Sequence, residues 1–287
     1  MRYRNPKIPE GINVSPGHPL RELALLAGAA ILLIVILAFL LGQFGGRLAR
    51  LLPFEHEAAI APVELLNSDA GPALQGYIDA LADRLTQRME LPEDMRISLR
   101  VDGGETFNAF ATLGGNVLLY RGLLEALPHE NALAMLLAHE IAHVAHRDPI
   151  VGIGRGAAVQ LVFGLLFGDP NLAVLGSAGL YTQLHFSRAM ERSADSAALA
   201  AVHGLYGHVA GARDLFNTIQ AERVRSGSGE PPAVFNSHPL DQKRIEALDL
   251  LASERQWSRI GEVTPLPATF GRWLDEAAAA SKDRSAH

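Results

Sequence analysis

The chain has 287 residues, of which 48% are apolar and 20% charged, so it can bury a substantial core and is not an intrinsically disordered protein. Its formal net charge of −6 argues against a general nucleic-acid-binding protein, which would carry a basic face. The sequence contains no cysteine, which excludes disulfides, thiolate metal sites and cysteine catalysis. Any metal must therefore be bound by histidine and carboxylate side chains.

The first predicted element is an apolar helix. Leu23 to Leu41 are nineteen consecutive apolar residues, and a helix of this length spans close to the ~30 Å hydrocarbon core of a bilayer. A buried helix of a soluble protein rarely stays apolar on every face for so long. A cleaved signal peptide is the nearer alternative, but the run exceeds a usual signal core and no A-x-A-like cleavage site follows it. We therefore predict an uncleaved transmembrane anchor at 23–46.

Basic residues flank this anchor unequally. Four precede it and two follow it closely, namely Arg2, Arg4, Lys7 and Arg21 before it, and Arg47 and Arg50 after it. By the positive-inside rule, residues 1–22 form a cytoplasmic tail and everything after residue 46 crosses the membrane. The sequence thus predicts a single-pass membrane protein whose main domain is extracytoplasmic.

The rest of the chain is predicted to form one mostly helical α+β domain. Apolar spacing and glycine or proline breaks define its elements. In chain order we predict a linker at 47–72, a helix at 74–89, strands at 97–101, 107–112 and 117–120, helices at 130–147, 187–202, 209–224 and 240–251, and a disordered tail at 276–287. The domain therefore covers 73–275.

Two further apolar stretches, at 157–167 and 172–184, are each too short to cross a bilayer comfortably. They are predicted to be core or lid helices. The alternative is that they dip into the membrane surface beside the anchor.

An H-E-x-x-H motif lies inside the helix predicted at 130–147, from His139 through Glu140 to His143. Residues four apart lie on one face of a helix, so both imidazoles can bind a single ion. Neutral imidazole is a common zinc ligand, and Glu140 projects beside the same face, where it can act as a base rather than as a ligand. Such a string also recurs by chance, so it needs support from the rest of the sequence.

Support comes from the helix predicted at 187–202, which carries Glu191 and Asp195 four residues apart. A catalytic zinc has three protein ligands and one open position, and Glu191 would complete the set with the two histidines. Asp195 would then accept the free N–H of a ligand imidazole and fix its tautomer. The alternative is a solvated helix face on which both carboxylates pair with Arg188 and Arg192.

Four blocks of sequence resemble the HtpX-like zinc metallopeptidases, a family that includes the CAAX prenyl endopeptidases. In chain order the blocks are NAFATLGG at 108–115, HEIAHVAHRD at 139–148, SRAMERSAD at 187–195 and SHPLDQKRIEAL at 237–248. The resemblance implies a gluzincin fold with a small sheet, hydrolysis of peptide bonds and one zinc ion per chain. It assigns His139, His143 and Glu191 as ligands and Glu140 as the catalytic base. HtpX itself has several membrane spans and works on the cytoplasmic side, so the substrate and the membrane side are not carried over.

Two further site predictions rest on the same blocks. His238 follows a loop rich in glycine, serine and proline, and Pro239 favours an extended backbone at this histidine. We predict that His238 reaches the zinc pocket, either to donate a hydrogen bond to the oxyanion or to occupy the open zinc position and hold the enzyme idle. A strand formed by Asn108, Ala109, Phe110 and Ala111 is predicted to bind extended substrate along an exposed sheet edge.

The sequence therefore predicts a membrane-anchored zinc endopeptidase that cleaves proteins or peptides, in quality control of membrane or envelope proteins, with no nucleic-acid partner. One alternative is a zinc-binding chaperone or adaptor with negligible proteolysis. Another is a structural membrane protein in which the motif is coincidental. The intact Glu140 argues against the first alternative, because a pure binding protein needs no catalytic base.

Overall fold

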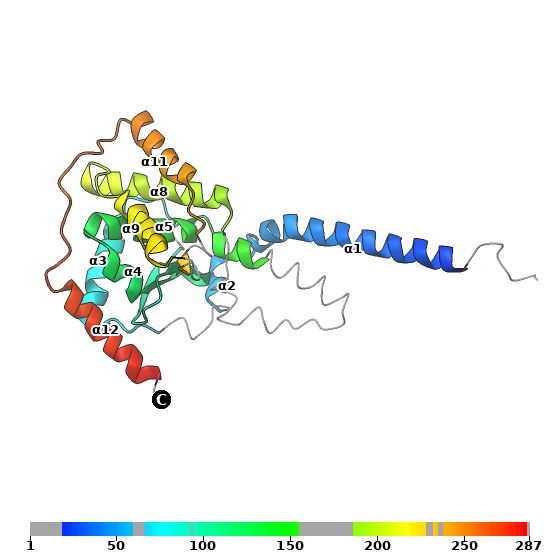
Figure 1. Cartoon of the computed structure of the whole chain (residues 1–287), viewed down its shortest axis with the longest axis horizontal. Coiled ribbons are helices and arrows are strands. Elements are labelled where there is room, and N and C mark those ends of the chain that lie inside the picture. The colour runs from blue at the N-terminus through cyan, green and yellow to red at the C-terminus, as the bar shows by residue number, and fades with distance from the viewer. Residues whose placement is uncertain are drawn as a thin grey trace, which may run out of the picture.

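The computed structural model describes residues 19–59, 67–92, 94–154, 186–227, 232–234 and 238–285. Helices dominate, and a small three-stranded sheet lies among them, which confirms the predicted fold class (Figure 1). The elements in chain order are α1 (Pro19–Ala49), α2 (Phe54–Ala59), α3 (Pro72–Thr86), β1 (Ser98–Asp102), β2 (Ala109–Ala111), the 3₁₀ turn η2 (Leu113–Gly115), β3 (Asn116–Tyr120), α4 (Arg121–Ala126), α5 (Glu130–Ala145), α8 (Arg188–Tyr206), α9 (Asp214–Arg225), α11 (Gln242–Glu254) and α12 (Phe270–Ser285).

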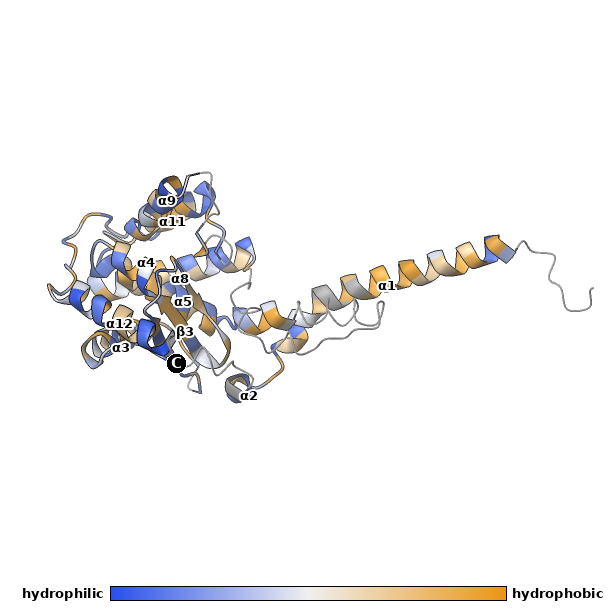
Figure 2. Ribbon diagram, turned by 60° about the horizontal axis from the view of Figure 1, so that its bottom comes forward, coloured by the Kyte–Doolittle hydropathy of each residue, from blue (hydrophilic) through white to orange (hydrophobic). Residues whose placement is uncertain are grey.

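Helix α1 projects from the body of the molecule, and Figure 2 shows hydrophobic residues along its length. Its stretch Pro19–Leu37 has a mean hydropathy of 2.4 and buries none of its residues against the rest of the chain. Among the described residues, one helix is long enough and apolar enough to cross a membrane, and it is α1. The helix is longer than the predicted 23–46 and continues into the body at Ala49.

The sheet has the strand order β1-β3-β2, with β1 parallel and β2 antiparallel to β3. Strand β2 is therefore an edge strand, as predicted for the residues around Phe110. The turn η2 joins β2 to β3 through Gly114 and Gly115, which both have positive φ angles. A Cβ on Gly115 would lie 1.7 Å from the Arg96 carbonyl oxygen, so only glycine fits there.

Helix α5 forms the centre of the domain, and all of its residues up to Val144 are buried. It packs against α8, α3 and the sheet. Its N-terminus is held by Glu130, whose carboxylate accepts hydrogen bonds of 2.8 Å from Tyr77 and Tyr206 and one of 3.2 Å from Arg84. A carboxylate at this end also complements the helix dipole. These contacts fix the position of the helix that carries the H-E-x-x-H motif.

One prediction of irregular structure is wrong. The tail predicted from residue 276 is helical through Ser285, because Phe270, Leu274 and Ala277 recur at helical spacing and are buried against the domain. The linker predicted from residue 47 contains α2, whose Glu57 is buried among polar partners. The apolar stretches at 157–167 and 172–184 lie outside the described residues.

Candidate metal centre

Helix α5 presents His139 and His143 on one face, as their spacing predicted. Both imidazoles are buried, and their Nε2 atoms lie 3.1 Å apart. Helix α8 packs across α5 and brings Glu191 Oε1 to 3.4 Å from His143 Nε2 and Glu191 Oε2 to 3.6 Å from His139 Nε2. The three predicted ligands thus meet at one point in the core.

His238 comes to the same point from the segment before α11. Its Nδ1 lies 3.3 Å from His139 Nε2 and 3.1 Å from Glu191 Oε1. The four side chains each offer a ligand atom within 4.8 Å of the other three. His238 therefore joins the three predicted ligands as a fourth candidate donor.

These separations fit a tetrahedral metal ion. Ligand atoms that lie about 2.0–2.1 Å from a tetrahedral zinc are about 3.3 Å from one another. The observed separations centre on this value, and nitrogen and carboxylate oxygen are donors that zinc accepts. A cation at this point would stabilise lone pairs that otherwise face one another inside the protein.

The other ring nitrogens of the two α5 histidines face carboxylates. Asp195 Oδ1 lies 3.0 Å from His139 Nδ1, and Asp148 Oδ2 lies 2.9 Å from His143 Nδ1. Such partners hold a ligand imidazole in the tautomer that directs Nε2 to the metal. The position of Asp195 is the one predicted for it. Asp148 was missed, although it closes the block quoted around the motif.

Arg244 from α11 joins the carboxylates behind the centre. Its Nε and one terminal nitrogen each lie 2.7 Å from Asp195, and the other terminal nitrogen lies 2.7 Å from Glu191 Oε2. The guanidinium is buried and paired in a geometry that only arginine provides. Glu191 Oε1 faces His143 and His238, while Oε2 lies between Arg244 and His139. Arg244 belongs to the block at 237–248 that resembles the family, but the sequence alone gave it no role.

The carboxylates favour positive charge at the centre. Burial alone would lower the pKa of His139, but hydrogen bonds to Asp195 and Glu191 outweigh it and raise the pKa to about 10. Burial would raise the pKa of Glu191, but the charge of His238 and hydrogen bonds to the imidazoles hold it well below its ordinary value. A metal cation would take the place of these protons, because ligands must be deprotonated to bind it.

Glu140 lies beside this centre and is not one of the convergent donors. Its side chain is buried, and its Oε1 lies 3.5 Å from His238 Nε2. Its Oε2 has no hydrogen-bond partner among the described residues. A buried carboxylate oxygen without a partner is costly, which indicates that the site is built to receive another polar group there.

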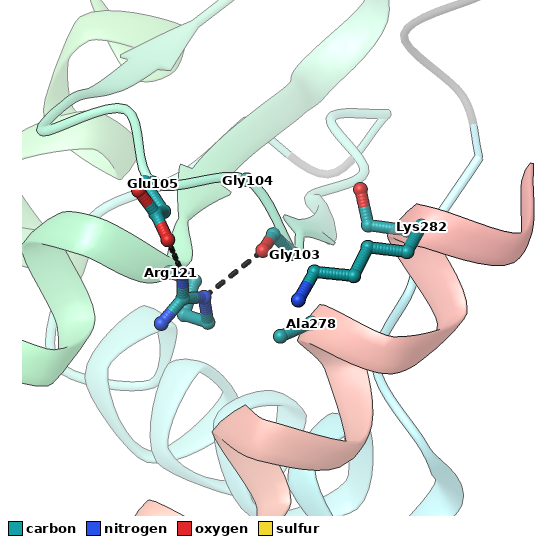
Figure 3. Close-up of a pocket in the computed structure, with 7 residues that line it drawn as sticks. Gly103, Gly104, Glu105, Arg121, Ala278 and Lys282 are labelled. Carbon is teal, nitrogen blue, oxygen red and sulfur yellow. Dashed lines mark hydrogen bonds and ion pairs between the residues drawn. The ribbon is translucent and has the colours of Figure 1, made fainter. Parts of the chain in front are cut away.

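The space next to Glu140 is small and apolar. A cavity of about 20 Å³, roughly the size of one water, is lined by Glu140, His238, His139 and Arg244. Its apolar lining residues are Leu136, Leu215, Phe216, Ile219, Val234 and Leu240. A larger cavity of about 360 Å³ lies elsewhere, between α12 and the turn at Gly103 and Gly104. In it Arg121 is already paired with Glu105 and the Gly103 carbonyl, and no residue of the metal centre lines it (Figure 3).

The predicted substrate strand lies on the edge of the sheet, and its residues from Asn108 to Ala111 are buried. The amide of Thr112 donates to Asn116, and the carbonyl of Asn108 accepts from Tyr120. Since backbone groups alternate along a strand, the N–H of Phe110 also faces β3. The N–H groups of the flanking alanines, at 109 and 111, face the free edge, so they and not Phe110 would meet a substrate.

Two helices that present His, His and Glu to one point beside a small sheet define a zincin-like domain. A comparison with family models matches residues 72–252 to "Peptidase family M48". The chain belongs to this peptidase family, which confirms the resemblance to HtpX-like metallopeptidases.

Individual relatives agree with this assignment. The chain is 29% identical over 189 residues to a putative beta-barrel assembly-enhancing protease of Vibrio cholerae, a match that covers 61% of this chain and 38% of that protein. It is 30% identical over 171 residues to the mitochondrial metalloendopeptidase OMA1 of Schizosaccharomyces pombe, covering 58% of this chain and 50% of OMA1. It is 27% identical over 281 residues to a protease HtpX homolog of Trichormus variabilis, covering 81% of this chain and 96% of that protein. The chain thus spans half or less of the length of the first two relatives.

The carboxylate of Asp148 gives a test of the centre. Asp148→Asn removes the charged partner of His143 Nδ1, and we expect zinc affinity to fall about 10–100-fold with the fold retained. Competition with a chelator of known affinity, on the full chain in detergent, measures the change. The control is Asp214→Asn, which alters a similar carboxylate–histidine pair with His129 outside the centre. Equal zinc affinity of Asp148→Asn and wild type would contradict the role of Asp148.

Proposed function

We propose that this protein is a membrane-anchored, zinc-dependent endopeptidase that hydrolyses protein substrates in the quality control of membrane or envelope proteins. The observation that supports it most is the convergence of three imidazoles and one carboxylate beside the unpartnered carboxylate of Glu140. The three relatives described above are each named as a protease or metalloendopeptidase, which supports the same activity.

In this proposal His139, His143 and Glu191 hold the zinc. When bound, the ion would supply a Lewis acid for a peptide carbonyl and for water. Glu140 accepts the proton of the attacking water and then gives it to the leaving amine. Its burial keeps the carboxylate beside the centre, and its unpartnered oxygen is free for this exchange. Asp195, Asp148 and Arg244 hold the ligands in place.

His238 distinguishes the described conformation from one ready for substrate. Its Nδ1 lies 3.1 Å from Glu191 Oε1 and 3.3 Å from His139 Nε2, and the cavity beside Glu140 has room for about one water. The amide of Val234 donates to the carbonyl of Phe107, next to β2, so the same segment also covers one end of the sheet edge. Of the two predicted roles, this geometry supports the idle state, in which His238 takes the place of water.

The membrane attachment is proposed from α1, which exposes an apolar surface along its whole first part. The excess of basic residues before it supports a cytoplasmic N-terminus and an extracytoplasmic domain.

Alkaline phosphatase fused after His287 should be active if this orientation holds. An inactive phosphatase fusion, together with an active cytoplasmic reporter at the same position, would reverse the topology.

The role of Glu140 can be tested without disturbing the ligands. Glu140→Gln keeps the size of the side chain, so we expect normal zinc content and a fall in peptide hydrolysis of roughly 10²–10⁴-fold. Proteomics of membranes that contain either the wild-type enzyme or this variant should show that substrates accumulate with the variant. A fully active variant would require another base. An inactive wild type with bound zinc would favour the adaptor alternative.

His238→Ala separates the two predicted roles of this histidine. If His238 closes the centre, the variant should show higher basal peptidase activity than wild type. If it stabilises the oxyanion, kcat should fall about 10²–10³-fold with little change in KM. His203→Ala is the control, because this histidine stacks on Trp257 outside the centre. We expect the first result, and the second would contradict the idle state.

The free edge of β2 can be probed with proline. Ala109→Pro removes an N–H that faces the edge, where proline is tolerated, so we expect a folded enzyme with lower kcat/KM. Phe110→Pro removes an N–H that faces β3 and should instead lower the melting temperature. Unchanged kinetics of a folded Ala109→Pro would mean that substrate binds elsewhere.

A further inference from the structure

The chain after α1, residues 50–57, includes the first part of α2 and contacts the chain at the end of the metal-binding helix. Arg50 lies 3.8 Å from Asp148, and Arg147 makes the closer contacts. Arg147 Nε lies 2.8 Å from Glu57 Oε1, and its terminal nitrogens donate to the carbonyls of Arg50 at 2.9 Å and Leu52 at 2.6 Å. Glu57 is buried, and its partner is largely so. This ion pair therefore joins two parts of the chain that are ninety residues apart.

Arg147 also controls the direction of the chain at the metal centre. It follows the last turn of α5 and has a φ of 57°, the left-handed conformation in which glycine usually ends a helix. The reversal turns the next residue, Asp148, back toward His143 Nδ1, 2.9 Å away. A residue other than glycine holds this conformation only when its surroundings fix it. Here the surroundings are Glu57 and the two carbonyls of the 50–57 segment.

Glu57 reaches a second part of the site with its other oxygen. Its Oε2 accepts a hydrogen bond of 3.4 Å from the amide of Gly114, in the turn that follows β2. Ala49 and Leu52 pack on an apolar cluster formed by Phe110, Leu113, Leu118, Ile150 and Ile153. The segment thus lies against both the metal-helix turn and the edge strand.

The end of α1 is fixed to the same region. A Cβ on Gly154 would lie 2.6 Å from the Ala49 Cβ and 2.8 Å from the Gly45 carbonyl oxygen, so the two backbones touch. Residues 148–154 are helical and connect this contact directly to Asp148. The base of α1, the 50–57 segment and the outer partner of His143 therefore form one packed unit.

We propose that Glu57 and Arg147 are positioning residues of the metal centre, through which the connection from α1 orients Asp148 and, with it, His143. The inference rests on the proposed function, because it assumes that the centre holds zinc. It adds that the chain immediately after the apolar helix is part of the active-site scaffold. Loss of the ion pair should loosen the metal ligand without touching it.

Zinc affinity of the full chain in detergent tests this coupling. Glu57→Gln should weaken zinc binding roughly tenfold, the lower end of the effect of an outer partner. If the effect passes through Asp148, the double variant Glu57→Gln/Asp148→Asn should bind zinc as well as Asp148→Asn alone, because coupled effects do not add. Arg147→Lys, which keeps the charge but loses the guanidinium geometry, should act in the same direction and serves if Glu57→Gln does not fold.

A matched control is present in the chain. Asp69 is also buried, pairs with Arg284 at 2.9 Å and accepts a hydrogen bond from the Gly103 amide. Neither of these two partners belongs to α5. Asp69→Asn should lower the melting temperature about as much as Glu57→Gln does, but it should leave the zinc affinity unchanged. Wild-type affinity in Glu57→Gln, or additive losses in the double variant, would overturn the proposal. Absence of zinc from the wild type would instead contradict the proposed function itself.

Discussion

Three imidazole nitrogens and the carboxylate of Glu191 meet inside the protein within 4.8 Å of one another, and this arrangement favours positive charge at their centre. Their lone pairs face one another in a region that water does not reach, where unpaired polar groups are costly. Helices α5 and α8 hold three of these groups, and the packing between the two helices is fixed by the core. The remaining features of the site serve to aim these four donors.

Charge balance extends outward from the centre. Asp195 and Asp148 face the ligand imidazoles, and Arg244 neutralises Asp195 and one oxygen of Glu191. Burial would raise the pKa of Asp195, but hydrogen bonds from Arg244 and His139 outweigh it and lower the pKa, so the carboxylate stays charged. Buried charges are stable only when paired in this way. The metal centre is thus one member of a network that reaches α11 and the chain after α1.

Sequence reasoning succeeded where the periodicity of a helix decides geometry. His139 and His143 share a face of α5 because they are four residues apart, and Glu191 and Asp195 share a face of α8 for the same reason. The roles predicted for these residues and for Glu140 remain predictions. The fold class and the peptidase family are confirmed. Strand β2 lies at the edge of the sheet, but its residues are buried and not exposed as predicted.

The sequence was less informative where tertiary contacts reverse a local preference. Asp148, which faces His143, directly follows Arg147, and Arg147 adopts a left-handed conformation that arginine does not normally favour. The partners that stabilise it lie about ninety residues earlier, in a stretch that composition describes as a linker. The helical C-terminal segment was a different error, since the spacing of Phe270, Leu274 and Ala277 was visible in the sequence.

X-ray absorption at the zinc edge, on the purified full chain with stoichiometric metal, tests the convergence of these donors most directly. The account predicts four nitrogen or oxygen neighbours at about 2.0–2.1 Å, with the multiple scattering of three imidazoles in the resting protein. A spectrum with two imidazoles would be consistent with the centre but would show that His238 does not bind the zinc. A chain that retains no zinc, or a spectrum with fewer than two imidazoles, would contradict the centre itself.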